Sequence, residues 1–183
     1  LLLAIGGNET TRNCISGGFL ALHAAPAQWA ALVADTQALA SCAVEEMLRW
    51  TSPIIAFRRT ATEAAQIGDQ AIAEGDKVVL YYASANRDEA VFPEPQRFDI
   101  ARAPNPHLSF GVGQHVCLGT TLARLEIRFL FERLVSRFPD MVPTGPIQRL
   151  ESNYVNGFTH FTVKPGRDRH PPAGRSLPDT QSP

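Results

Sequence analysis

The sequence predicts a mainly helical protein with a small β component. Apolar residues recur at helical spacing over residues 37–50 and again over residues 118–137, which is the clearest helix of the chain. Two short stretches, Ile54 to Thr60 and Lys77 to Tyr82, are rich in β-branched and aromatic residues and are expected to form strands. Because the expected strands are few and short, the helices are expected to dominate the fold.

The remaining elements follow from proline and glycine positions. Residues 1–24 are expected to form a buried apolar helix interrupted by the glycine pairs at 6–7 and 17–18. The other expected elements are a short helix from Pro26 to Val33, a proline-rich loop over 90–106, and a hairpin over 149–164 that turns near Asn156-Gly157.

Composition limits the class of protein. The 183 residues are 44% hydrophobic and carry a net charge of −1, so neither a nucleic acid nor a membrane surface is expected as partner. Leu1 to Ile5 is too short for a membrane anchor, and three cysteines suit a reducing cytoplasm. Residues 1–164 are expected to be part of one domain and residues 165–183 a disordered tail. Since no initiator methionine is present, we treat the chain as a C-terminal fragment.

Cys117 is the strongest candidate for chemistry. Gly111 and Gly113 precede it and Gly119 follows it, so the backbone can turn tightly and approach a flat ligand closely. The long helix begins just after Cys117. A thiolate at a helix N-terminus is stabilised by the helix dipole and by free backbone N–H groups, which suits a metal ligand.

Three other interpretations of Cys117 compete at this point. A dinucleotide-binding glycine loop would need a third glycine at position 116, which is valine. A zinc site could begin with His115 and Cys117, but no second close pair supplies the remaining ligands. An isolated cysteine is most often only a buried side chain.

The run Phe110-Gly-Val-Gly-Gln-His-Val-Cys-Leu-Gly119 resembles the haem-binding signature of the cytochrome P-450 family of haem-thiolate monooxygenases. Three further motifs, described below, occur along the chain in the family's order, so the resemblance covers about residues 1–164. It implies the C-terminal half of the cytochrome P-450 fold, with Cys117 as axial ligand to the iron of haem b. In such enzymes the thiolate donates electron density that favours O–O cleavage. The residues implied in cofactor binding at this loop are Phe110, Gly111, Gly113, Cys117 and Gly119.

The segment Gly6-Gly7-Asn8-Glu9-Thr10-Thr11 is costly as a helix, because each glycine loses roughly 1 kcal/mol relative to alanine. By itself it is equally compatible with a helix end that carries a solvated glutamate and capping threonines. It resembles the oxygen-binding segment of the family, in which an acid–alcohol pair follows small residues. The resemblance makes Glu9 and Thr10 the catalytic pair: Thr10 positions the protons that reduced O₂ requires, and Glu9 relays them.

Glu46 and Arg49 lie three residues apart and therefore on one helix face. Such a pair alone is usually a surface ion pair that contributes under about 1 kcal/mol. It also resembles the family's Glu-x-x-Arg motif, which an arginine of a later loop joins, and Arg97 occupies that place. The three residues are expected to be buried together and to hold the proline-rich loop, as a structural rather than a catalytic group.

The two haem propionates need cationic partners. Arg59 and His107 stand where the family places propionate ligands, and His115 is a third candidate. Arginine suits the role because its guanidinium binds a carboxylate through two hydrogen bonds. Arg58 competes with Arg59, and a solvent-exposed cation is the alternative for each residue.

The family's substrate pocket corresponds here to Ile54, Ile55, Ala56 and Val155. The first three are apolar, so a hydrophobic substrate is expected. Segments 56–62, 84–88 and 105–107 resemble soluble bacterial members that oxidise steroid side chains or fatty-acyl chains, and the expected substrate is steroid, fatty-acyl or terpenoid-like.

The electrons are expected to come from a ferredoxin and its reductase, because the sequence contains no flavin or iron–sulfur motif. Arg124 and Arg128 are candidate contacts for such an acidic partner, or ordinary solvated charges of the helix.

These observations predict a cytoplasmic haem-thiolate monooxygenase that inserts one atom of O₂ into a C–H bond. A peroxygenase or isomerase of the same family and a non-catalytic truncated haem-binding fragment are the alternatives. The intact Glu9-Thr10 pair argues against the first. The fragment alone is expected to be inactive, because part of its cofactor pocket would be missing.

Overall fold

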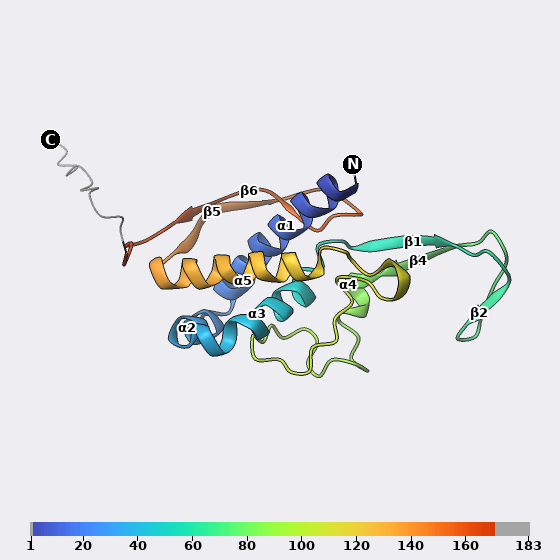
Figure 1. Ribbon diagram of the computed structural model, residues 1–183, viewed down its shortest axis with the longest axis horizontal. Coiled ribbons are helices and arrows are strands. Elements are labelled where there is room, and N and C mark those ends of the chain that lie inside the picture. Colours follow the sequence, from blue (N-terminus) through green and yellow to red (C-terminus); the bar gives the residue numbers. More distant parts are fainter. Residues whose placement is uncertain (1, 171–183) are drawn as a thin grey trace.

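The computed structural model describes residues 2–170, and helices make up most of it (Figure 1). Figure 1 shows α5 crossing α1, with α2 and α3 on one side and the β5–β6 ribbon on the other. The helices are α1 (Leu2–Ala24), α2 (Pro26–Ala34), α3 (Thr36–Thr51), the single turn α4 (Tyr82–Ala85), the 3₁₀ turn η1 (Gly113–His115) and α5 (Thr120–Arg137). The expected class, mainly helical with a small β component, is confirmed.

The strands form three separate two-stranded antiparallel sheets. They are β1 (Ala56–Thr60) with β4 (Lys77–Tyr81), β2 (Ala65–Ile67) with β3 (Gln70–Ile72), and β5 (Val142–Arg149) with β6 (Phe158–Lys164). The β1–β4 ribbon extends away from the helices and ends in the β2–β3 hairpin (Figure 1).

The two strands expected over residues 54–60 and 77–82 are present as β1 and β4 and pair with each other, with Phe57 opposite Leu80. The β2–β3 hairpin between them was not expected, because its strands have only three residues each and turn at Gly68, whose φ is +57°. The C-terminal hairpin is longer than expected, since β5 already begins at Val142.

The expectation that glycine pairs interrupt the first helix is wrong, because α1 runs without a break from Leu2 to Ala24. Gly17 and Gly18 serve packing instead. A Cβ atom at Gly17 would lie 2.6 Å from Cγ2 of Thr51, and one at Gly18 would lie 2.7 Å from Cγ of Met47. The missing side chains therefore allow α1 to lie directly against α3.

Gly17→Ala is expected to lower the free energy of unfolding by about 1–3 kcal/mol, because buried Thr51 cannot move away from the new methyl group. Gly6→Ala is the matched control. No atom lies within 4 Å of a Cβ at Gly6, so this variant should gain up to about 1 kcal/mol from helix propensity. Urea unfolding of the two variants measures both values, and equal effects would contradict the packing role of Gly17.

The core lies where α1, α2, α3 and α5 meet. α5 contributes Ile127, Phe131 and Val135 to it, each at most 3% exposed. The apolar residues that predicted this helix lie on its other side and are exposed: Leu118, Leu122, Leu125 and Phe129. We call the three of these that lie on the helix, Leu122, Leu125 and Phe129, the outer stripe of α5; Leu118 lies just before it. The helix was therefore predicted correctly, although it begins at Thr120, and its buried face is a different one.

Part of the expected disordered tail has contacts. Asp168 forms an ion pair with Arg137 of α5, and the N–H of Arg169 donates a hydrogen bond to the Arg137 carbonyl. The remainder of that tail, residues 171–183, lies outside the described residues. Within residues 2–170 no helix is long and apolar enough to cross a membrane.

Candidate functional site

The loop that carries Cys117 is closed by its own backbone. Gly111 and Gly113 have φ values of +70° and +75°, which L-residues with side chains rarely adopt. These turns bring the N–H of Cys117 to 2.9 Å from the carbonyl oxygen of Phe110. The glycines in the sequence pattern are therefore required by the backbone conformation.

Cys117 lies three residues before the first residue of α5, and Gly119 occupies the N-cap. A Cβ at Gly119 would lie 3.8 Å from the Cys117 sulfur, in ordinary van der Waals contact with it. The first N–H groups of a helix have no partner within it and carry partial positive charge. The Cys117 sulfur therefore lies near the positive end of the helix dipole.

Only one of the three cysteines offers its sulfur at the surface. Cys117 is exposed, Cys42 is half-buried and Cys14 is fully buried in α1. Burial raises the pKa of the Cys14 thiol to about 12, despite a hydrogen bond from Thr51. Cys14 is therefore a core residue, and Cys117 is the thiol available to a ligand.

Apolar side chains surround Cys117 without covering it. Val112, Val116 and Leu118 are 74%, 54% and 88% exposed, although each would be buried in an ordinary core. Together with the open backbone at Gly113, they present an apolar surface around a free sulfur. This combination fits a flat, apolar cofactor that a thiolate ligates, which is the chemistry of haem. No group of three or more residues able to hold a bare metal ion occurs within residues 2–170, so the zinc alternative gains no support.

The glycine-rich segment of α1 is open on its outer side. No atom lies within 4 Å of a Cβ built at Gly6 or Gly7. The Thr10 hydroxyl donates a hydrogen bond to the Gly6 carbonyl oxygen at 2.5 Å. The Glu9 carboxylate forms an ion pair with Arg12, and its side chain is 43% exposed. Thr10 is thus held along the helix, while Glu9 is in contact with solvent.

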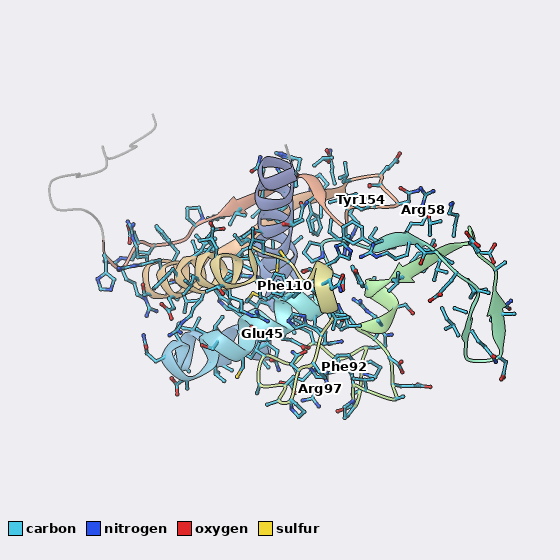
Figure 2. The ribbon with its side chains drawn as sticks, turned by 45° about the vertical axis from the view of Figure 1, so that its right-hand side comes forward. Glu45, Arg58, Phe92, Arg97, Phe110 and Tyr154 are labelled. Atoms are coloured by element: carbon cyan, nitrogen blue, oxygen red, sulfur yellow. The ribbon has the colours of Figure 1, made fainter. Side chains whose placement is uncertain are left out.

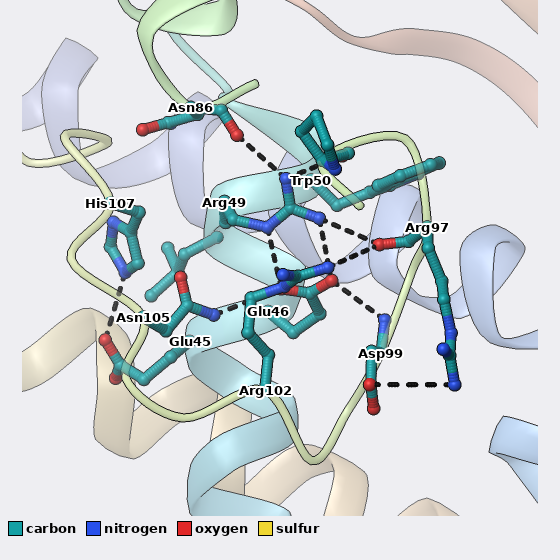
Figure 3. Close-up of polar contacts among 12 residues, drawn as sticks. Glu45, Glu46, Arg49, Trp50, Asn86, Arg97, Asp99, Arg102, Asn105 and His107 are labelled. Carbon is teal, nitrogen blue, oxygen red and sulfur yellow. Dashed lines mark hydrogen bonds and ion pairs between the residues drawn. The ribbon is translucent and has the colours of Figure 1, made fainter. Parts of the chain in front are cut away.

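The expected buried ion pair is present. Nε and Nη2 of Arg49 donate to the two carboxylate oxygens of Glu46, both at 2.8 Å, and both side chains are 0% exposed. Arg49 also donates to the carbonyl oxygens of Asn86, Pro95 and Arg97, so none of its charge is left unpaired (Figure 3).

The third arginine of this group is not the expected one. Arg102 places Nε 3.2 Å from Glu46 and is 9% exposed, whereas the Arg97 side chain is 56% exposed and pairs with Glu94. Arg97 contributes only its backbone carbonyl, which accepts hydrogen bonds from Arg49 and Arg102 (Figure 3). The prediction failed because two arginines lie in one irregular loop, where no period indicates which side chain points inward. Burial was the missing information.

Another carboxylate on α3, Glu45, forms a second cluster. Nε and Nη2 of Arg124 lie 2.6 and 2.8 Å from its two oxygens, and Nε2 of His107 lies 3.0 Å from Oε2 (Figure 3 shows the histidine). Burial by itself raises the pKa of Glu45, but hydrogen bonds from His107 and Arg124 outweigh it and lower the value to about 2.

The Glu45 cluster is expected to make stability depend on pH. Because the folded-state pKa is below the ordinary value of 4.5, the ionised carboxylate stabilises the folded chain above that pH. This contribution is lost as the pH falls from 4.5 towards 2. Urea unfolding of wild type and Glu45→Gln across this range should show a difference that shrinks with acidity. A difference that stays constant would contradict the assigned pKa.

The structure gives His107 a different partner from the expected one. Its side chain is 2% exposed, Nε2 faces Glu45, and Nδ1 accepts a hydrogen bond from the N–H of Ser109. With both ring nitrogens occupied, His107 does not face a propionate. Arg59 on β1 and His115 on η1 are exposed and stay candidates, and the Arg58 side chain is exposed as well (Figure 2).

The two segments expected to line a substrate pocket lie together. Ile54 forms an antiparallel bridge with Val155, and the N–H of Ile55 donates to the carbonyl oxygen of Tyr154 at 2.9 Å. Ala56 continues this backbone into β1. Tyr154 also packs edge-on against Phe57, so the neighbourhood is apolar (Figure 2 labels Tyr154).

The two arginines expected to contact a partner are both paired within the chain. Arg124 binds Glu45, and Arg128 binds Glu132 at 2.7 Å. Their charges are thus largely neutralised, and the structure does not support a free basic patch at these two residues.

Several residues of these clusters were not predicted. Asn86 is fully buried; its side chain accepts from the N–H of Leu108 and donates to the hydroxyls of Ser52 and Ser109. Nothing in the sequence around Glu45 distinguishes it from an exposed glutamate. Its partners His107 and Arg124 are 62 and 79 residues away in sequence. Local sequence patterns carry no signal for contacts of this kind.

Comparison with known proteins identifies the family. The model of the cytochrome P450 family matches residues 36–160. The chain belongs to the cytochrome P450 family. Members of this family bind haem b, and the match includes the whole Cys117 loop.

Individual relatives agree with this assignment. The chain is 49% identical over 164 residues to a methyl-branched lipid omega-hydroxylase of Mycobacterium tuberculosis and 42% identical over 164 residues to a steroid C26-monooxygenase of Mycolicibacterium smegmatis; each match covers 89% of the chain. Among solved structures, P450BioI in complex with a hexadec-9Z-enoic acid ligated acyl carrier protein matches with a TM-score of 0.86 and 41% identity over 88% of the chain and 42% of that protein. The chain spans about 38% of the length of the two curated relatives.

Proposed function

We propose that this chain is part of a haem-thiolate monooxygenase that inserts one atom of O₂ into a C–H bond of a hydrophobic, lipid-like substrate. The observation that carries the proposal is the exposed Cys117 at the N-terminus of α5, within a closed glycine loop of a cytochrome P450 chain. Bound haem supplies the redox chemistry that activates O₂.

Cys117 would ligate the haem iron, because it is the only exposed cysteine of the described residues and lies at a positive helix end. Arg59 and His115 are assigned to the propionates, since both are exposed and carry N–H groups that can donate to a carboxylate. The backbone at Gly113, where no atom lies within 4 Å of a Cβ, leaves room for the macrocycle to approach closely.

Thr10 and Glu9 are assigned to proton delivery. The Thr10 hydroxyl is held by the Gly6 carbonyl, so its oxygen has a fixed position beside the open backbone of Gly6 and Gly7. Glu9 reaches solvent and can take up protons there, and its carboxylate pairs with Arg12 on the same helix.

The substrate is assigned as an apolar chain of the lipid or steroid kind. The backbone bridge that brings the apolar residues Ile54 and Val155 together supports this class, as do the relatives named for a methyl-branched lipid and a steroid. A ferredoxin and its reductase are the proposed electron donors, and the cytoplasm the proposed compartment.

The test uses a chimera in which the 164 matched residues of this chain replace those of the mycobacterial lipid hydroxylase, which is 49% identical. Its reduced, carbon monoxide-bound form should absorb at about 450 nm, the signature of thiolate-ligated haem. With NADPH, ferredoxin and reductase it should hydroxylate a methyl-branched lipid or a steroid side chain. A folded chimera without the band would refute haem-thiolate binding, and the band without any oxygenated product would refute the monooxygenase assignment.

Thr10→Ala in this chimera is expected to increase the hydrogen peroxide released per NADPH consumed, because protons are no longer positioned for productive O₂ reduction. The band at about 450 nm should stay, since Thr10 does not hold the cofactor. Thr11→Ala is the neighbouring control and should leave the ratio close to wild type. An unchanged ratio in Thr10→Ala would remove Thr10 from the mechanism.

A further inference from the structure

The two ends of the Cys117 loop are held by the same carboxylate. His107 precedes the loop by three residues, and Arg124 lies one turn into α5, beyond Cys117. Both donate to Glu45 of α3, at 3.0 Å from His107 and at 2.6 and 2.8 Å from Arg124. Glu45 therefore connects α3 to the entry and to the exit of the loop.

Arg124 also contacts the loop itself. Its guanidinium lies 4.7 Å from the centre of the Phe110 ring, a distance at which a cation is attracted to an aromatic face. Phe110 in turn accepts the hydrogen bond from the N–H of Cys117. A continuous path of contacts thus leads from Glu45 through Arg124 and Phe110 to the backbone of Cys117.

The neighbouring carboxylate has a separate task. Glu46 holds Arg49, Arg102, the side chain of Asn105 and the backbone N–H of Asp99, all outside residues 107–119 (Figure 3). Glu45 and Glu46 are adjacent on α3, and consecutive helix residues point in directions about 100° apart. Of the two carboxylates, Glu45 is therefore the one that bonds directly to residues on both sides of the Cys117 loop.

We propose that Glu45 is a positioning residue for the axial thiolate: through Arg124 and His107 it holds both ends of the Cys117 loop against α3. The role of Glu45 in positioning an iron ligand rests on the proposed function. The contacts of Glu45 with His107 and Arg124 are present in the chain without cofactor. Glu45 touches neither cofactor nor substrate in this proposal. Its effect passes through the position of the loop.

The first test is hydrogen–deuterium exchange on the 183-residue chain without haem. In Glu45→Gln the amides of residues 107–119 should exchange about tenfold faster, because a neutral amide binds Arg124 and His107 less strongly than a carboxylate does and the loop opens more often. Glu132→Gln is the matched control, since it removes the partner of Arg128 on the same helix but far along it from the loop. Faster exchange throughout α1 and α3 would indicate global destabilisation and would contradict a local restraint.

Arg124→Lys separates the geometry from the charge. Lysine keeps the positive charge but loses the two parallel hydrogen bonds and the planar contact with Phe110. We expect this variant to speed exchange of residues 107–119 as Glu45→Gln does, by severalfold. Exchange at the wild-type rate in both variants would overturn the proposal.

The second test measures how the haem iron is ligated, from the absorption of its carbon monoxide complex. In the chimera, Glu45→Gln should shift part of the carbon monoxide band from about 450 nm to shorter wavelength, because a displaced sulfur no longer ligates the iron as a thiolate. Glu132→Gln should leave the band in place. A wild-type chimera without the band would refute the proposed function alone, and the exchange experiment would still decide the role of Glu45. A normal band in Glu45→Gln, with wild-type exchange, would refute only the inference.

Discussion

Replacing Cys117 by serine in the chimera is expected to abolish the carbon monoxide band at about 450 nm. Serine has nearly the same shape, so the loop should still close through the backbone hydrogen bond to Phe110. Its hydroxyl is a poor anion at neutral pH and cannot replace a thiolate as electron donor. We therefore expect oxygenated product to fall below detection while secondary structure by circular dichroism is retained.

Cys42→Ser is the control for this experiment. Cys42 lies on α3 and is half-buried, so the substitution changes a thiol of the same fold outside the loop. It should keep the band and the activity. Retention of the band in Cys117→Ser, or its loss in Cys42→Ser, would show that the ligand has been assigned to the wrong residue.

The second large effect concerns stability. Arg49→Ala is expected to lower the free energy of unfolding by about 3–5 kcal/mol, because it leaves the Glu46 carboxylate charged and buried beside a cavity. It also removes hydrogen bonds to three loop carbonyls, at Asn86, Pro95 and Arg97. Urea unfolding followed by circular dichroism measures the change. If the loss exceeds the free energy of unfolding of the wild-type chain, Arg49→Ala will be unfolded even without urea.

Arg97→Ala is the informative comparison. The structure places its side chain at the surface, so we expect a loss of no more than about 1 kcal/mol. Arg102→Ala should cost clearly more, because Arg102 contacts Glu46 and three loop carbonyls from a nearly buried position. A larger loss in Arg97→Ala than in Arg102→Ala would contradict the placement of Arg102, rather than Arg97, beside Glu46.

The secondary structure was predictable where a period or a breaker was present. The α3 helix was expected over residues 37–50 and runs from Thr36 to Thr51, where Ser52 with a φ of +39° and Pro53 end it. The continuity of α1 was not predictable, because Gly17 and Gly18 have low helix propensity and their packing against α3 cannot be inferred from local sequence. Tertiary contact decided the conformation there.

The site was predictable to the extent that its residues share a short motif. Phe110 to Gly119 could be recognised as one unit, because the positive φ angles at Gly111 and Gly113 require glycine itself. Contacts between distant segments were not accessible in this way. The choice of Arg102 over Arg97 and the pairing of His107 with Glu45 both depend on which side chains are buried.

The outer stripe of α5 has a consequence for how the chain behaves in water. A helix that is apolar on two opposite sides belongs inside a larger body of protein, and here only one side is covered by the described residues. Exposed leucine and phenylalanine side chains in a row attract one another across molecules. At high concentration the isolated chain should therefore associate, more strongly in salts that favour apolar burial.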